Sequence, residues 1–138
     1  MGNAAMKKEE RVLLYQFPAE QISTAQDVLR ALGIHVQILR ADAWREKVGY
    51  LLGRKGFRAT QTSDADDFAF SHRLLLLENI QGKRLTKILD ALQEVGIPHI
   101  TYKSVITPYN MLWTLRYLCE HMEKEHAPSG DLLEGDIR

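Results

Sequence analysis

The fold of this chain is indicated most clearly by residues 73–97, which read RLLLLENIQGKRLTKILDALQEVGI. Its four consecutive leucines leave no polar position to face water, which is typical of a strand covered on both faces. Apolar residues then recur at steps of three and four, as along one face of a helix: Leu85, Ile88, Leu89, Leu92 and Val95. Gly96 followed by Ile97 is typical of a left-handed helix end with an apolar contact after it. The stretch therefore predicts a buried strand, an amphipathic helix and a glycine cap.

An earlier stretch, residues 11–39, repeats this pattern. It predicts a buried strand, a helix that follows Pro18, a glycine cap and a second strand. The two stretches align at a constant offset of 63 residues, so that Leu14 falls on Leu77 and Gly33 on Gly96. A register that is kept through strand, helix and cap predicts an internal duplication of a βαβ unit.

Two such units predict an α+β protein with a ferredoxin-like, four-stranded sheet. The two fully apolar runs, 12–15 and 74–77, are expected at its centre, and the alternating runs 36–39 and 100–106 at its edges. The central strands are apolar on both sides, so something must cover the second face. The candidates are the helix that follows Pro108, which we favour, the segment 42–72 and a second copy of the chain. The predicted organisation is a disordered leader (1–10), a single domain (11–126) and a mobile tail (127–138). Within the domain we expect two halves (11–40 and 73–106), an insert with a short helix (41–72) and a C-terminal helix (107–126).

The composition sets limits on the function. The chain has 138 residues, of which 18 are basic and 18 acidic, so its formal net charge is +0. This balance argues against broad binding to nucleic acid or to acidic membranes and leaves local patches to be judged singly. A single cysteine, Cys119, and the lack of an apolar run near 18 residues predict a reduced, soluble, cytoplasmic protein without a membrane span.

The insert contains one motif with a known ligand chemistry, the run Gly53-Arg54-Lys55-Gly56. It resembles the loop with which KH domains clamp a nucleic-acid backbone. A KH loop leads directly into a second amphipathic helix, whereas residues 58–67 have no apolar stripe. We therefore favour a capped helix end followed by a solvated basic turn.

No metal, cofactor or catalytic site is predicted. Asp64, Asp66 and Asp67 lack the register of a calcium loop, and His121 and His126 are spaced by five residues rather than by the four that would place them on one helix face. The chain shows no nucleophile with a base in a recognisable order, no CxxC and no dinucleotide fingerprint.

The most suggestive candidate site lies around residues 103–117. Thr107 and Pro108 suit the cap and first position of a helix, whose first turn favours an anion. Lys103 could point out from an edge strand near that turn. In the alternative, purely structural reading, Lys103 only protects the sheet edge from pairing and the nearby polar and aromatic residues support the helix. The candidate binding surface, with the turn GYLLGRKGF as its far wall, comprises Lys103, Thr107, Asn110, Trp113, Tyr50, Gly53, Gly56 and Phe57.

Three patterns together, LLYQF, GYLLGRKGF and K-x-V-x-TP-x-N-x-x-W, resemble a small bacterial family catalogued only as a domain of unknown function. The likeness extends over residues 11–126. Its sharpest part comprises Lys103, Val105, Thr107, Pro108, Asn110 and Trp113. The resemblance implies a standalone bacterial α+β protein, and it carries over no activity.

Three classes of function are weighed. The leading hypothesis is a non-enzymatic module that binds a small ligand or a protein partner, because duplicated βαβ sheets of this size often do so; a homodimer through a sheet face or edge belongs to this hypothesis. The second is a single-stranded nucleic-acid or ribosome-associated protein. It would use the basic residues Arg54, Lys55, Arg58, Lys83 and Arg84. An enzyme ranks third.

Overall fold

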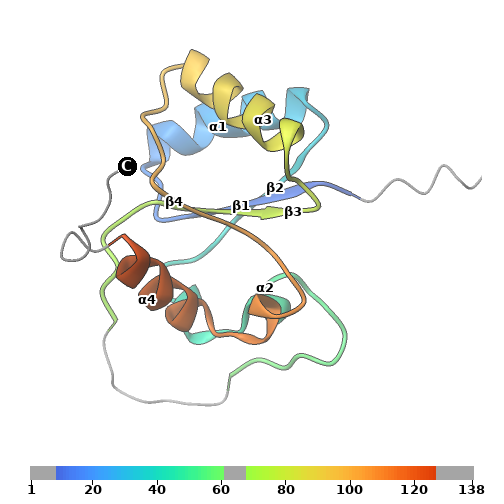
Figure 1. Cartoon of the computed structure of the whole chain (residues 1–138), viewed down its shortest axis with the longest axis vertical. Coiled ribbons are helices and arrows are strands. Elements are labelled where there is room, and N and C mark those ends of the chain that lie inside the picture. Colours follow the sequence, from blue (N-terminus) through green and yellow to red (C-terminus); the bar gives the residue numbers. More distant parts are fainter. Residues whose placement is uncertain (1–8, 61–67, 127–138) are drawn as a thin grey trace, which may run out of the picture. The chain divides into compact units, whose positions relative to one another are not determined.

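The computed structural model describes residues 9–60 and 68–126 (Figure 1). The elements in chain order are β1 (Arg11–Tyr15), α1 (Ala19–Ala31), β2 (His35–Ile38), η1 (Ala43–Arg45), α2 (Val48–Leu51), β3 (Leu74–Glu78), α3 (Lys83–Glu94), β4 (Tyr102–Val105), η2 (Asn110–Leu112) and α4 (Leu115–Glu125), where η denotes a 3₁₀ helix.

Contacts divide the described residues into two compact units. The sheet unit comprises the described parts of Met1–Ala41 and Ser71–Thr107, and the helical unit those of Asp42–Phe70 and Pro108–Arg138. The single domain expected over residues 11–126 stays a prediction. Of the leader expected over residues 1–10, the structure describes Glu9 and Glu10, whose carbonyl oxygens accept hydrogen bonds from the sheet unit, and the remainder lies outside the described residues. The predicted tail lies outside the described residues.

The sheet unit confirms the predicted α+β class and strand order. Its mixed sheet runs β2-β1-β3-β4, with β1 parallel to β2, β3 parallel to β4, and the two central strands antiparallel. The fully apolar strands are therefore central. Figure 1 shows α1 and α3 side by side on one face of this sheet.

The core of the sheet unit lies between the sheet and these two helices. One set of alternating strand residues meets the apolar stripes of the helices: Val12, Leu14, Leu75 and Leu77 from the strands, with Leu29, Ile88 and Leu92 from the helices. The opposite set is also buried, and comprises Leu13, Tyr15, Leu74 and Leu76. Side chains on both faces of the central strands are therefore buried, as the run of leucines predicts. The helix that we expect to cover the second face stays a prediction.

Both helices end as the sequence predicts. Gly33 has φ +80° and Gly96 has φ +92°. The residue after each glycine donates its backbone N–H to the carbonyl five positions back in the Schellman pattern, from Ile34 to Leu29 at 3.0 Å and from Ile97 to Leu92 at 3.2 Å. The left-handed conformation needed here is one that glycine adopts without a steric cost.

The duplication extends to positions that the sequence pattern did not reveal. Gln16 and Asn79, 63 residues apart, are the non-glycine residues with positive φ in the described chain, at 64° and 61°. The Gln16 amide donates to the His72 carbonyl oxygen at 3.3 Å, and the Asn79 amide donates to that of Glu9 at 2.7 Å. Glu9 and His72 are themselves one repeat apart. In each copy, the side-chain amide at this position therefore donates an equivalent hydrogen bond to the segment that precedes the first strand of the other copy.

From the second strand of each copy onward, equivalent residues are 67 positions apart rather than 63. The Leu39 N–H donates to the Leu14 carbonyl at 2.9 Å, and the Ile106 N–H donates to that of Leu77 at 2.8 Å. The longer connection before β4 accounts for the change of register. Beyond these strands, both copies continue through a turn, a 3₁₀ helix, an extended residue and an α-helix.

This continuation forms the helical unit. Lys47 and Thr114 form an antiparallel bridge, flanked by two reciprocal hydrogen bonds. The Val48 N–H donates to the Trp113 carbonyl at 2.9 Å, and the Leu115 N–H donates to the Glu46 carbonyl at 2.8 Å. The segment predicted as an insert, 41–72, is thus in its first part the counterpart of the C-terminal segment rather than an addition to the repeat.

The predicted start of the C-terminal helix at residue 107 is wrong. The helix α4 begins at Leu115, and the Thr114 hydroxyl caps it by accepting the Tyr117 N–H at 3.1 Å. The bridge holds Trp113 and Thr114 extended, so the helix cannot run through them. The same constraint divides the short helix predicted after Asp42, because Lys47 is extended between η1 and α2.

Candidate functional site

The helical unit contains a cleft with a volume of about 770 Å³. This size lies within the range of small-molecule binding sites. Its wall combines residues of η1, the Lys47–Thr114 bridge, the loop after α2 and the first turn of α4. The lining residues are Trp44, Arg45, Lys47, Lys55, Gly56, Phe57, Arg58, Thr60, Leu112, Thr114 and Arg116.

The loop over 53–60 is fixed at both ends. After the helix ends at Gly53, which has φ +76°, the Arg54 N–H donates to the Gly49 carbonyl at 3.0 Å. At the far end the Thr60 N–H donates to the Glu46 carboxylate at 2.8 Å, and the Thr60 hydroxyl donates to the Arg45 carbonyl at 2.9 Å. These bonds hold the loop as an ordered wall.

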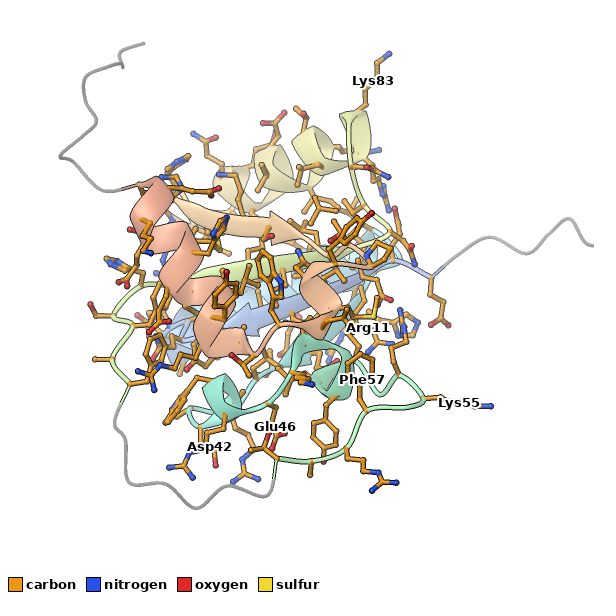
Figure 2. All side chains as sticks on the ribbon, turned by 60° about the horizontal axis from the view of Figure 1, so that its bottom comes forward. Arg11, Asp42, Glu46, Lys55, Phe57 and Lys83 are labelled. Atoms are coloured by element: carbon orange, nitrogen blue, oxygen red, sulfur yellow. The ribbon has the colours of Figure 1, made fainter. Side chains whose placement is uncertain are left out.

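Phe57 packs directly against α2. A Cβ built on Gly49 would lie 2.3 Å from Phe57 Cζ and 2.4 Å from Cε2, far inside van der Waals contact. Glycine at position 49 therefore lets the ring lie flat against the helix backbone. Figure 2 shows Phe57 near the ribbon of α2, while Lys55 extends outward from the same loop. The half-buried Phe57 ring is a supported apolar surface within the cleft.

Two arginines are held by aromatic rings at the other side of the cleft. Trp44 and Phe68 lie with their ring centroids 5.7 Å apart. The Arg45 guanidinium carbon is 4.9 Å from the Trp44 ring centroid, and that of Arg116 is 5.8 Å from Trp44 and 5.2 Å from Phe68. Arg116 also forms an ion pair with the carboxylate of Glu120 at 3.1 Å. The cation–π contacts orient both guanidinium groups.

Among the residues that the structure describes, the lining of the cleft contains several cations and no carboxylate. The charged lining residues are Arg45, Lys47, Lys55, Arg58 and Arg116. Lys47, Lys55 and Arg58 are exposed, and within the described part of the chain none of the three forms an ion pair with a carboxylate. In a chain whose net charge is +0, this is a concentrated positive surface. The lining also contains no histidine or cysteine, so the arrangement suits binding of an anion better than proton transfer.

The structure brings only part of the sequence-predicted surface into this cleft. Gly56 and Phe57 line it, while Gly53 ends α2 beside it. Tyr50 is 37% exposed on α2, and Asn110 is 93% buried in η2 (7% exposed). These five residues all belong to the helical unit.

The remaining predicted residues lie elsewhere. Lys103 and Thr107 belong to the sheet unit, and the Lys103 ammonium donates to the Ile100 carbonyl at 2.9 Å. Trp113 meets Tyr117 edge-on at 4.8 Å between centroids. Tyr109 and Trp113 both precede α4, whereas Tyr117 lies within it. A common surface of Lys103 with Asn110 and Trp113 stays a prediction.

Cys119 is fully buried, and burial first, then the charges of Glu123 and Glu120, raise the pKa of its thiol to about 12. Over residues 9–60 and 68–126 no group of three or more potential metal ligands comes together. Asp64, Asp66 and Asp67 lie outside the described residues. None of the described helices is long and apolar enough to cross a membrane.

Sequence reasoning missed most of the cleft. Trp44, Arg45, Lys47 and Arg116 are brought together by the bridge, whose hydrogen bonds join positions more than 60 residues apart. No local pattern announces such a contact. The local signals that were available, the GRKG turn and Phe57, were found.

Comparison with known proteins supports the resemblance to an uncharacterised family. Residues 73–127 match the family model described as a domain of unknown function (DUF3783). The match spans β3, α3, β4, η2 and α4, which together make up the second copy of the repeat. No curated protein and no solved structure matches the chain.

Proposed function

We propose that this chain is a non-enzymatic binding module that holds an anionic ligand in the cleft of the helical unit. The single observation that carries the proposal is that the described lining residues include five cationic side chains and no carboxylate. The ferredoxin-like duplicated sheet would then serve as scaffold. A cytoplasmic location belongs to the proposal, supported by one fully buried cysteine whose raised pKa keeps it unreactive.

The ligand-binding form of this hypothesis is favoured over a protein-interaction surface by the shape of the site. Phe57 and the pinned loop make a preformed concave wall, and preformed concave sites are typical of ligand binding. The exposed lysines and arginines around it provide electrostatic attraction that fades with salt. Affinity for anions should therefore fall as ionic strength rises.

Intrinsic fluorescence gives a direct test. Both tryptophans, Trp44 and Trp113, lie in the helical unit, and Trp44 lines the cleft. We expect titration with tripolyphosphate at low salt to change the emission with a saturable isotherm. The double variant Lys47→Ala/Arg58→Ala should weaken binding by about tenfold, because it removes two unpaired cations from the lining.

The matched control removes the same charge elsewhere. Lys83 and Lys87 are exposed on α3, and Figure 2 shows Lys83 projecting away from that helix. Lys83→Ala/Lys87→Ala should leave the affinity within about twofold. An equal loss in both double variants, or no saturable binding of any anion, would refute the proposal.

A further inference from the structure

We infer that the anion held by the cleft is single-stranded nucleic acid, with its phosphates on Lys47, Lys55 and Arg58 and a base stacked on Phe57. This inference rests on the proposed function and names the ligand class of the same site. It differs from a KH-type arrangement, because residues 57–60, which directly follow the GRKG turn, are not helical and the phosphates would be held by side chains.

The exposure of the cations favours a polymer over a small anion. Lys47, Lys55 and Arg58 all lie at the protein surface, where a single ion pair is weakened by solvent and salt. A strand with several phosphates contacts these residues together and releases counterions from each neutralised phosphate. The three exposed charges therefore contribute much more binding free energy to a polyanion than to one small ligand.

The supported aromatic ring favours a nucleic acid over an acidic peptide. The Phe57 ring packs against Gly49, is half-buried, and is one of the residues that line the cleft. A positively charged groove with an aromatic stacking platform is the arrangement that proteins use for single strands without sequence preference. An acidic peptide would form ion pairs with the cations, but its charged side chains have no aromatic ring to stack on Phe57.

The same ring favours a single strand over a duplex. Base faces in a duplex are covered by their neighbours in the stack, whereas those of a single strand are available to an aromatic side chain. The guanidinium groups over Trp44 and Phe68 present further planar groups in the same cleft. Bases that flank the stacked one have partners in the guanidinium planes.

The test is fluorescence anisotropy of the full chain with a labelled oligothymidylate of about ten nucleotides, a length within known single-strand site sizes. We expect saturable binding that weakens steeply between about 50 and 200 mM salt. Lys47→Ala should reduce the slope of log affinity against log salt by about one, while Lys83→Ala should leave it unchanged. A duplex of the same length should bind about tenfold more weakly.

Variants of Phe57 separate stacking from charge. Phe57→Leu should weaken oligothymidylate by about tenfold and leave tripolyphosphate unchanged, whereas Phe57→Tyr should retain binding of both. Circular dichroism of each variant confirms that the fold is kept.

The outcomes distinguish the two proposals. If tripolyphosphate or polyglutamate binds at the cleft as tightly as oligothymidylate and Phe57→Leu has no effect, the nucleic-acid inference fails while anion binding stands. If none of the probes binds, both fail. If the duplex binds as well as the single strand, stacking on Phe57 is wrong.

Discussion

Replacing Gly49 by alanine should displace the Phe57 ring from the cleft wall. The added Cβ would lie 2.3, 2.4 and 2.7 Å from three carbon atoms of that ring. Ordinary contacts between carbon atoms begin near 3.5 Å, so the ring must retreat by roughly 1 Å. The helix backbone is fixed because the N–H groups of residues 50–52 donate to the carbonyl oxygens of Lys47 and Val48, so the side chain is the part that moves.

The expected change in stability is a balance of two terms. Glycine to alanine within a helix is favourable by about 0.5–1 kcal/mol. Loss of part of the packing of a half-buried phenylalanine costs about 1 kcal/mol, taken as a fraction of the roughly 1.5–3 kcal/mol of full burial. The free energy of unfolding should therefore change by less than about 1 kcal/mol, while oligonucleotide affinity falls by about tenfold through the displaced ring.

A double-mutant cycle isolates the contact. In the Phe57→Ala background the clash is absent, so Gly49→Ala should become stabilising, and the coupling between the two positions should be about 1 kcal/mol. Urea unfolding followed by the emission of Trp44 and Trp113 measures all four variants, since both reporters lie in the helical unit. A coupling of zero, together with unchanged oligonucleotide affinity in Gly49→Ala, would refute the contact as the support of the cleft wall.

Three further predictions concern the scaffold. Gly33→Ala and Gly96→Ala should each lower the free energy of unfolding by about 1 kcal/mol in urea titrations, because Cβ is strained at φ +80° and +92°; unchanged stability in both would contradict the cap assignment. Asn79→Ala should cost about 1–2 kcal/mol by losing its 2.7 Å bond to the Glu9 carbonyl and by placing alanine at φ 61°, and Asn79→Gly should cost less in the same assay. The pKa of the Cys119 thiol is about 12 in the folded protein and has its ordinary value of 9.0 in the unfolded chain, so the free energy of unfolding should fall as the pH rises from 9.0 toward 12. Cys119→Ala should flatten that pH dependence. A thiol reagent at pH 8 should label only the unfolded protein.

The features of the fold that were predictable from sequence are those encoded locally. The leucine run at 74–77 predicted a central strand because it contains no polar side chain that could face solvent. Gly33 and Gly96 specified helix ends because each is followed by an apolar residue that packs back on the helix. The strand order followed from the contrast between fully apolar and alternating runs.

The features that were not predictable depend on distant partners. The alignment of the two copies changes from 63 to 67 residues before β4, which hid the relation between α2 and α4. Thr107-Pro108 resembled a helix start, yet the bridge at Lys47 and Thr114 delays the helix to Leu115. The local helix signal was overridden by hydrogen bonds to the other copy.

The candidate site divides in the same way. Phe57 and the basic turn were visible in the motif GYLLGRKGF. Arg45 and Arg116 both lie over Trp44 because the two copies of the repeat meet within the helical unit. The need for glycine at position 49 is visible only once the Phe57 ring is seen to pack on it. Spacing along the chain carries no information about such contacts.

The most direct test of the central claim, that the cleft of the helical unit is the binding site, is a map of backbone amide shifts by NMR during titration with oligothymidylate. The predicted result is that the largest shifts fall on residues 44–58 and 112–116, with Phe57 among them, while α3 around Lys83 and Lys87 is unchanged. Shifts centred on α3, or spread evenly over the basic residues of the chain, would contradict the account.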